Sequence, residues 1–100
     1  MAKRVFLSAR DLVFRSKLAA VVDGAGAVMG RDPDECDLAV VDVELPGAAD
    51  RIRSFVERGI PVLAYGAHVR PELLRAAREA GATAVPNSQV QERLAGLLKA

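Results

Sequence analysis

The first candidate for a functional side chain is Asp42, which lies in the stretch DLAVVDVELPG, residues 37–47. It directly follows the apolar run 38–41, and the chain-breaking pair Pro46–Gly47 comes shortly after it. A continuous valine-rich run of this kind is typical of a strand at the centre of a parallel sheet. In an open parallel sheet, ligands and reactive groups gather at the carboxyl ends of the strands. The sequence therefore presents Asp42 as a strand-end carboxylate that could carry chemistry.

Other short apolar runs are also followed by small or polar residues. If those runs are neighbouring parallel strands, the residues after them meet Asp42 at the same edge of the sheet. The residues that we expect to line this site are Ala9, Arg10 and Asp11 after the first run, Gly66 after the fourth and Ser88 after the last.

The elements that must position these residues alternate between short apolar runs and segments with helical periodicity. This alternation predicts an α/β fold, in which helices cover both faces of a parallel sheet. Residue types at the segment ends support the boundaries: Asp11 can cap a helix, and Gly24 is suited to end it. The expected strands are 5–7, 27–29, 38–41, 60–65 and 83–85, and the expected helices are 11–23, 48–58, 71–80 and 88–98.

One helix is missing from this alternation. Between Gly24 and Asp37 the chain has too few residues for both a full strand and the helix that should follow it. The segment RDPDEC, residues 31–36, is polar and contains a proline. We therefore expect the second helix to be absent or reduced to a turn.

Length and composition exclude several classes of protein. One hundred residues form one domain, which we expect to span residues 1–100. Fourteen basic and thirteen acidic residues give a net charge of +1, which predicts neither a nucleic-acid partner nor a membrane partner. A single cysteine, Cys36, and a single histidine argue against a zinc site. The amino terminus does not resemble a signal peptide, so we expect a cytoplasmic location.

Three stretches together resemble the receiver domains of bacterial response regulators, the CheY-like family. They are DLAVVDVELPG around Asp42, PVLAYGAH at residues 61–68 and AREAGATAV at residues 77–85. The resemblance runs over nearly the whole chain and keeps the order of the elements. It implies a flavodoxin-like, doubly wound, five-stranded parallel sheet with strand order 2-1-3-4-5.

The resemblance also implies a chemistry. Receiver domains accept a phosphoryl group from a histidine kinase on the strand-end aspartate, which Asp42 matches. In that family an acidic pair holds Mg²⁺, and a hydroxyl and a lysine complete the site. Here the acidic pair falls on Ala9 and Arg10, the hydroxyl on Gly66 and the lysine near Ser88. The chain therefore looks like a degenerate receiver, or pseudo-receiver.

Two interpretations of the site remain open. Asp42 is either a phospho-acceptor or a retained acid stabilised by Arg10, whose guanidinium would take the place of the metal. Asp11 is either a helix N-cap or, together with Asp42, a weak candidate ligand for a metal. Cofactors are not expected, and Mg²⁺ enters only if Asp42 is a phospho-acceptor.

We expect no enzymatic activity but a regulatory domain that acts through protein–protein interaction. In the family that the chain resembles, the fourth helix, fifth strand and fifth helix commonly bind partners or form homodimers. Here that face would draw on residues from about Arg70 to Lys99. The alternatives are a phospho-accepting receiver and a flavodoxin-like module that binds a small molecule.

Overall fold

The computed structural model describes residues 2–99 as five parallel strands and four α-helices. The strand order is β2-β1-β3-β4-β5, with every neighbouring pair parallel. This is the doubly wound, flavodoxin-like arrangement that the sequence predicted. The bounds are β1 Arg4–Ser8, α1 Leu12–Gly24, β2 Val28–Gly30, β3 Leu38–Asp42, α2 Ala48–Glu57, β4 Val62–Gly66, α3 Pro71–Glu79, β5 Thr83–Pro86, a 3₁₀ turn Asn87–Gln89 and α4 Val90–Lys99.

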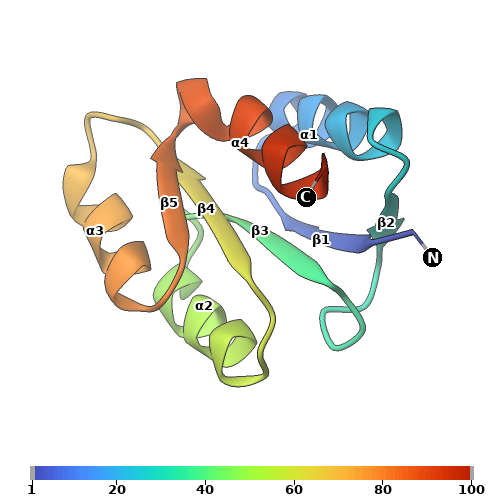
Figure 1. The fold of residues 1–100 in the computed structure, drawn as a ribbon. Coiled ribbons are helices and arrows are strands. Elements are labelled where there is room, and N and C mark those ends of the chain that lie inside the picture. The colour runs from blue at the N-terminus through green and yellow to red at the C-terminus, as the bar shows by residue number, and fades with distance from the viewer. Residues whose placement is uncertain (1, 100) are drawn as a thin grey trace.

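Helices cover the sheet from both sides, with α1 and α4 on one face and α2 and α3 on the other (Figure 1). Side chains alternate between the two faces along each strand, so every strand feeds two cores. Val40 points into the core beneath α1 and α4, whereas its neighbour Val41 points into the core above α2 and α3. All five residues of β3 and all five of β4 are buried. Asp42 is therefore held at the end of the most enclosed strand pair in the sheet.

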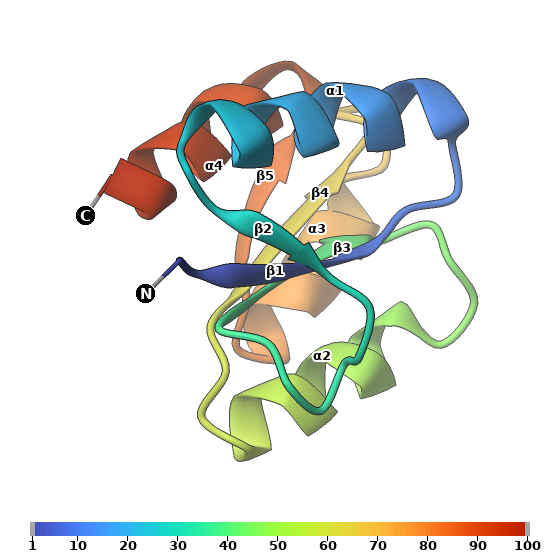
Figure 2. The same ribbon diagram turned by 90° about the vertical axis from the view of Figure 1, so that its right-hand side faces the viewer.

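No helix connects β2 to β3, as the chain length predicted. Residues 31–37 instead form a loop that passes over the α2 side of the sheet (Figure 2). Arg58, at the end of α2, pairs with the carboxylate of Asp34 and donates a hydrogen bond to the carbonyl of Pro33. The backbone N–H of Asp37 donates a hydrogen bond to the carbonyl of Arg4, and the Asp37 carboxylate accepts one from the backbone N–H of Arg4. These contacts tie the loop down in place of a packed helix.

The carboxyl end of α1 differs from the sequence prediction in its details. We expected Gly24 to take the left-handed conformation that ends a helix, but Gly24 is the last helical residue. The glycine with positive φ is Gly26, at +76°. The segment DGAG offers two glycines: the helix ends at the first, Gly24, and the second, Gly26, takes the left-handed conformation two residues later.

Within residues 2–99, no helix is both long enough and apolar enough to cross a membrane.

Candidate functional site

Asp42 lies at the end of β3 with only 4% of its surface exposed. One carboxylate oxygen, Oδ1, accepts a hydrogen bond from the backbone N–H of Glu44 at 3.0 Å. The other, Oδ2, lies 3.6 Å from Nε of Arg10, which follows β1. A buried carboxylate is costly unless it is paired and hydrogen-bonded, and Asp42 is both. The structure thus brings together the two residues that the sequence analysis placed at adjacent strand ends.

A second acid, Glu44, extends this pair into a cluster of four charges. Arg10 donates a hydrogen bond through Nη2 to Oε2 of Glu44 at 3.0 Å. Oε1 of Glu44 lies 3.6 Å from Nη1 of Arg70, which precedes α3. The cluster of Asp42, Arg10, Glu44 and Arg70 therefore links the loops that follow β1, β3 and β4. A short hydrogen bond from Arg70 also lowers the pKa of the exposed Glu72 carboxyl.

Glu44 and Arg70 are not among the site residues predicted from the sequence. Both residues follow strand ends, as the predicted site residues do. Glu44 contacts Arg10 and Arg70 because of the paths that the β3–α2 and β4–α3 loops take over the sheet edge. The folded loops are needed to see these contacts.

Gly66, at the position where receivers carry a hydroxyl, is buried at the end of β4. A Cβ added there would overlap Cγ2 of Val43, which lies one residue after Asp42. Serine or threonine therefore fits at position 66 only if Val43 moves. The site has an apolar methyl group where the resemblance would place a phosphate-binding hydroxyl.

The other predicted site residues have separate positions. Asp11 accepts a hydrogen bond from the backbone N–H of Val13 at 2.7 Å and is the N-cap of α1. Ala9 is half-buried against the core under α1. Ser88 is exposed in the 3₁₀ turn after β5, and within residues 2–99 no hydrogen bond joins it to Asp42.

Tyr65 is Asp42's partner in the β3–β4 register and is almost fully buried. Its ring stacks on that of Phe14, with 5.3 Å between the ring centroids. Burial, and then the negative charge of Asp42, raises the pKa of the phenol. Its hydroxyl oxygen has no hydrogen-bond partner among the described residues. We therefore regard Tyr65 as a packing residue that carries an unsatisfied polar atom.

These residues do not offer the donor set that Mg²⁺ prefers, which is several hard oxygen ligands around one point. Asp42 and Glu44 are the carboxylates at the site, and each already faces the guanidinium of Arg10. Among residues 2–99, no group of three His, Cys, Asp or Glu side chains is arranged to hold a metal ion.

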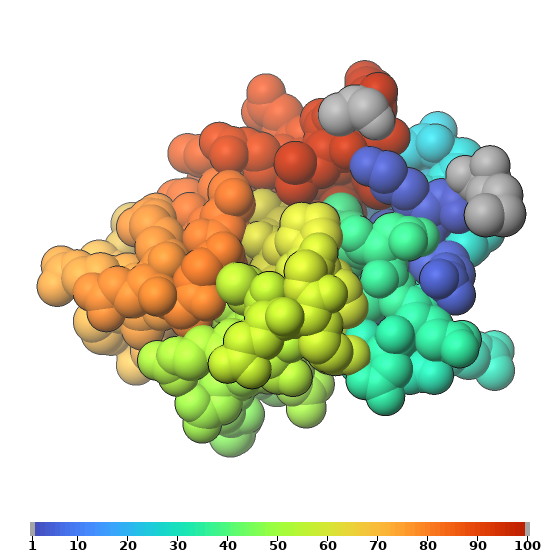
Figure 3. Space-filling model, turned by 60° about the horizontal axis from the view of Figure 1, so that its bottom comes forward, coloured from blue at the N-terminus to red at the C-terminus, as the bar shows by residue number. Residues whose placement is uncertain are grey.

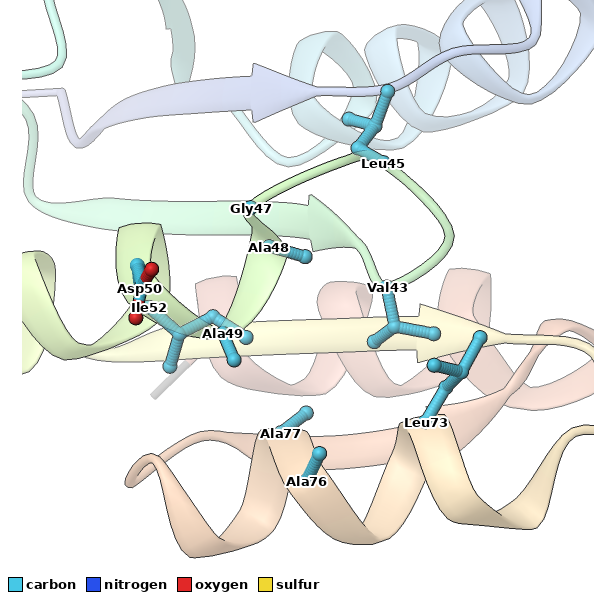
Figure 4. A pocket seen from close by; sticks show the side chains of 10 residues that line it. All are labelled: Val43, Leu45, Gly47, Ala48, Ala49, Asp50, Ile52, Leu73, Ala76 and Ala77. Carbon is cyan, nitrogen blue, oxygen red and sulfur yellow. The ribbon is translucent and has the colours of Figure 1, made fainter.

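An apolar hollow of about 230 Å³ lies next to the site, between α2 and α3 (Figure 4). Val43 and Leu73 border it at one end, and alanines of both helices form its walls. Asp50 is the one charged residue that lines it in the described part of the chain, and it pairs with Arg53 at 2.8 Å.

Comparison with known proteins identifies the fold through solved structures alone, since no protein-family model and no curated protein matches the chain. The beryllofluoride-activated receiver domain of DrrB superimposes with a TM-score of 0.79 at 21% identity, covering 99% of this chain and 96% of that one. A putative response regulator from Chloroflexus aurantiacus gives 0.78 at 20% identity, with 99% and 96% covered. The chain has the receiver-domain fold.

Receiver-fold domains also occur within longer chains. NtrX from Brucella abortus superimposes with a TM-score of 0.72 at 18% identity, covering 99% of this chain but 28% of that one. At these identities the similarity establishes the receiver fold and leaves the activity to be argued from the site.

Proposed function

We propose that this chain is a receiver-like regulatory domain that acts through protein–protein interaction and is not phosphorylated in the usual Mg²⁺-dependent way. The observation that carries the proposal is the pairing of the buried Asp42 carboxylate with Arg10. The side chain that would be the nucleophile already lies 3.6 Å from a cationic side chain of the same chain.

The physical argument rests on the charge that develops during phosphoryl transfer. A carboxylate that attacks an anionic phosphoryl group needs a cation which contacts the nucleophile and the phosphoryl oxygens together. Mg²⁺ carries two charges and offers open coordination positions for both. Arg10 carries one charge and divides its contacts between Asp42 and Glu44. The methyl group of Val43 next to Gly66 further narrows the space in which a phosphoryl group would sit.

We place the interaction surface on α3, β5 and α4, by analogy with the fold family. Leu97, on α4, is 36% exposed there and supplies an apolar contact point. A second copy of the chain is one partner that this face would accept. Light scattering over a wide range of concentrations tests whether the chain forms a homodimer. A monomer at the highest concentration would exclude it.

The proposal predicts that beryllofluoride with Mg²⁺ leaves the amide NMR signals around Asp42 unchanged. Beryllofluoride mimics an acyl phosphate and needs both a free aspartate and a metal. The matched control is Asp42→Asn, which removes the charge and keeps the shape. Signals at residues 42–44 and 66 that shift in the wild type but not in Asp42→Asn would overturn the proposal in favour of a phospho-acceptor.

A further inference from the structure

The missing helix leaves the β1–β2 edge of the sheet open on the side of α2. Phe6, in the middle of β1, is only partly buried, although its neighbours Val5 and Leu7 are enclosed. Between Phe6, α2 and the loop 31–37 lies a hollow of about 480 Å³ (Figure 3 shows this face). A second hollow, of about 600 Å³, lies between β1, β2 and α1. Phe6 and Arg31 line both hollows, which lie on opposite faces of the same sheet edge. Arg15 from one hollow and Arg51 from the other reach consecutive residues of β1, Leu7 and Ser8.

Three arginines line these hollows without a carboxylate partner among residues 2–99. Arg15, from α1, donates a long hydrogen bond to the carbonyl of Leu7, and Arg51, from α2, donates one to the Ser8 hydroxyl at 3.0 Å. Arg31 forms no ion pair with any residue in 2–99. A guanidinium has five N–H donors, so each of the three retains donors for a further ligand.

Within residues 2–99, the neighbouring acids Asp34, Asp32 and Asp11 form no ion pair with these three arginines. Asp34, which lines the first hollow, is paired with Arg58. Asp32 accepts a hydrogen bond from the backbone N–H of Asp34. Asp11 is occupied as the N-cap of α1. The hollows thus combine unpaired guanidinium groups with one partly exposed aromatic ring, which is an environment complementary to an anion.

We propose that Arg15, Arg31 and Arg51 form a binding site for the phosphate group of a small molecule, at the sheet edge that the missing helix leaves open. The planar guanidinium fork matches the geometry of phosphate oxygens. Volumes of this size suit a small ligand. Phe6 supplies an apolar surface for the part of the ligand attached to the phosphate. The site is separate from Asp42 and does not depend on the function proposed above.

The test is a titration of the full chain with inorganic pyrophosphate, followed by amide NMR. We expect saturable shifts at Phe6, Gly30, Arg31 and Arg51, with a dissociation constant below about 1 mM. A parallel titration with AMP distinguishes a phosphate carried by a nucleotide from an inorganic or aliphatic phosphate. Tighter binding of AMP, at the same amides, identifies a nucleotide-type ligand, and equal or weaker binding identifies an inorganic or aliphatic phosphate.

Matched charge variants make the test specific. Arg31→Gln and Arg51→Gln should each weaken pyrophosphate binding about tenfold. Arg53→Gln removes the same charge from an exposed residue of α2 that pairs with Asp50 outside both hollows, and should leave binding unchanged. Arg31 is an exposed loop residue, so its variant tests the site even if Arg51→Gln unfolds.

Four results would overturn the proposal. The first is the absence of saturable shifts, and the second is an equal loss of binding in Arg53→Gln. The third is tighter binding of a hexaglutamate peptide than of pyrophosphate, because the site would then recognise an acidic protein segment. Loss of binding in Asp42→Asn would likewise place the phosphate at the strand-end site instead.

Discussion

Three consecutive residues, the last of β3 and the two that follow it, give the strand-end site its character. Asp42 turns inward and meets Arg10, Val43 occupies the space beside Gly66, and Glu44 connects Arg10 to Arg70. Asp42 and Glu44 are tied by a backbone hydrogen bond, so the positions of the two acids depend on each other. A change at any of the three therefore affects the other two.

At the residue scale, Gly66→Ala should lower the free energy of unfolding by about 1–3 kcal/mol, because the new methyl group overlaps Val43. Combining it with Val43→Ala should cost less than the sum of the two single changes, since the smaller side chain makes room. Urea denaturation of the four chains measures this coupling.

The control for this cycle is Gly96→Ala in α4, where an added Cβ meets nothing within 4 Å. It should raise the free energy of unfolding by about 0.5–1 kcal/mol, as expected for alanine in a helix. If the losses in unfolding free energy of the two single variants simply add in the double variant, the side chains at positions 43 and 66 do not compete for the same space.

At the scale of elements, the site is assembled by loops whose starting points are fixed by regular structure. Asp11 caps α1 and so determines how the segment 9–11 leaves β1, while Pro71 begins α3 directly after Arg70. The loop that replaces the second helix has no such regular packing and is held by its contacts with Arg58 and Arg4. One edge of the sheet is therefore less covered than the other.

Asp11→Ala should destabilise the chain by about 1 kcal/mol through loss of the cap on α1. Asp11→Asn removes the negative charge but keeps an oxygen that can accept the hydrogen bond from Val13, so it should stay within a few tenths of the wild type. Thermal unfolding followed by circular dichroism compares the three chains. Equal losses in both variants would mean that the charge of Asp11, and not its capping bond, is what stabilises the fold.

At the scale of the whole molecule, a buried thiol and a buried phenol make the stability of the fold pH-dependent in the alkaline range. Burial raises the pKa of the Cys36 thiol and of the Tyr65 phenol above their ordinary values. Below those ordinary values both groups are protonated in the folded and unfolded states. Above them the unfolded chain loses its protons more readily, so stability falls as pH rises.

We therefore expect the melting temperature to fall between about pH 9 and pH 11, and to fall less in Tyr65→Phe. Tyr65 is the only tyrosine, so absorbance at 295 nm follows its ionisation directly. In the folded chain this absorbance should rise only as the chain unfolds. Ionisation near pH 10 without unfolding would show that the hydroxyl is open to water.

The overall topology was predictable because β3, β4 and the amphipathic helices carry strong, local patterns. The absent helix was predictable from chain length between Gly24 and Asp37. The approach of Arg10 to Asp42 follows from the parallel pairing of β1 with β3. Glu44, Arg70 and the overlap of Val43 with position 66 depend on loop paths and side-chain directions, which no pattern in the sequence encodes.

The contact between Val43 and position 66 also limits how the site could be altered one substitution at a time. Gly66→Ser alone brings the new side chain against Val43. Arg10→Asp alone puts a third carboxylate beside Asp42 and Glu44 while removing the cation that both of them face. Each first step towards a phosphorylatable site is therefore unfavourable by itself. The three positions thus show sign epistasis: changes that are unfavourable singly become useful only in combination. A designer who wants that chemistry in this chain has to replace Arg10, Val43 and Gly66 together.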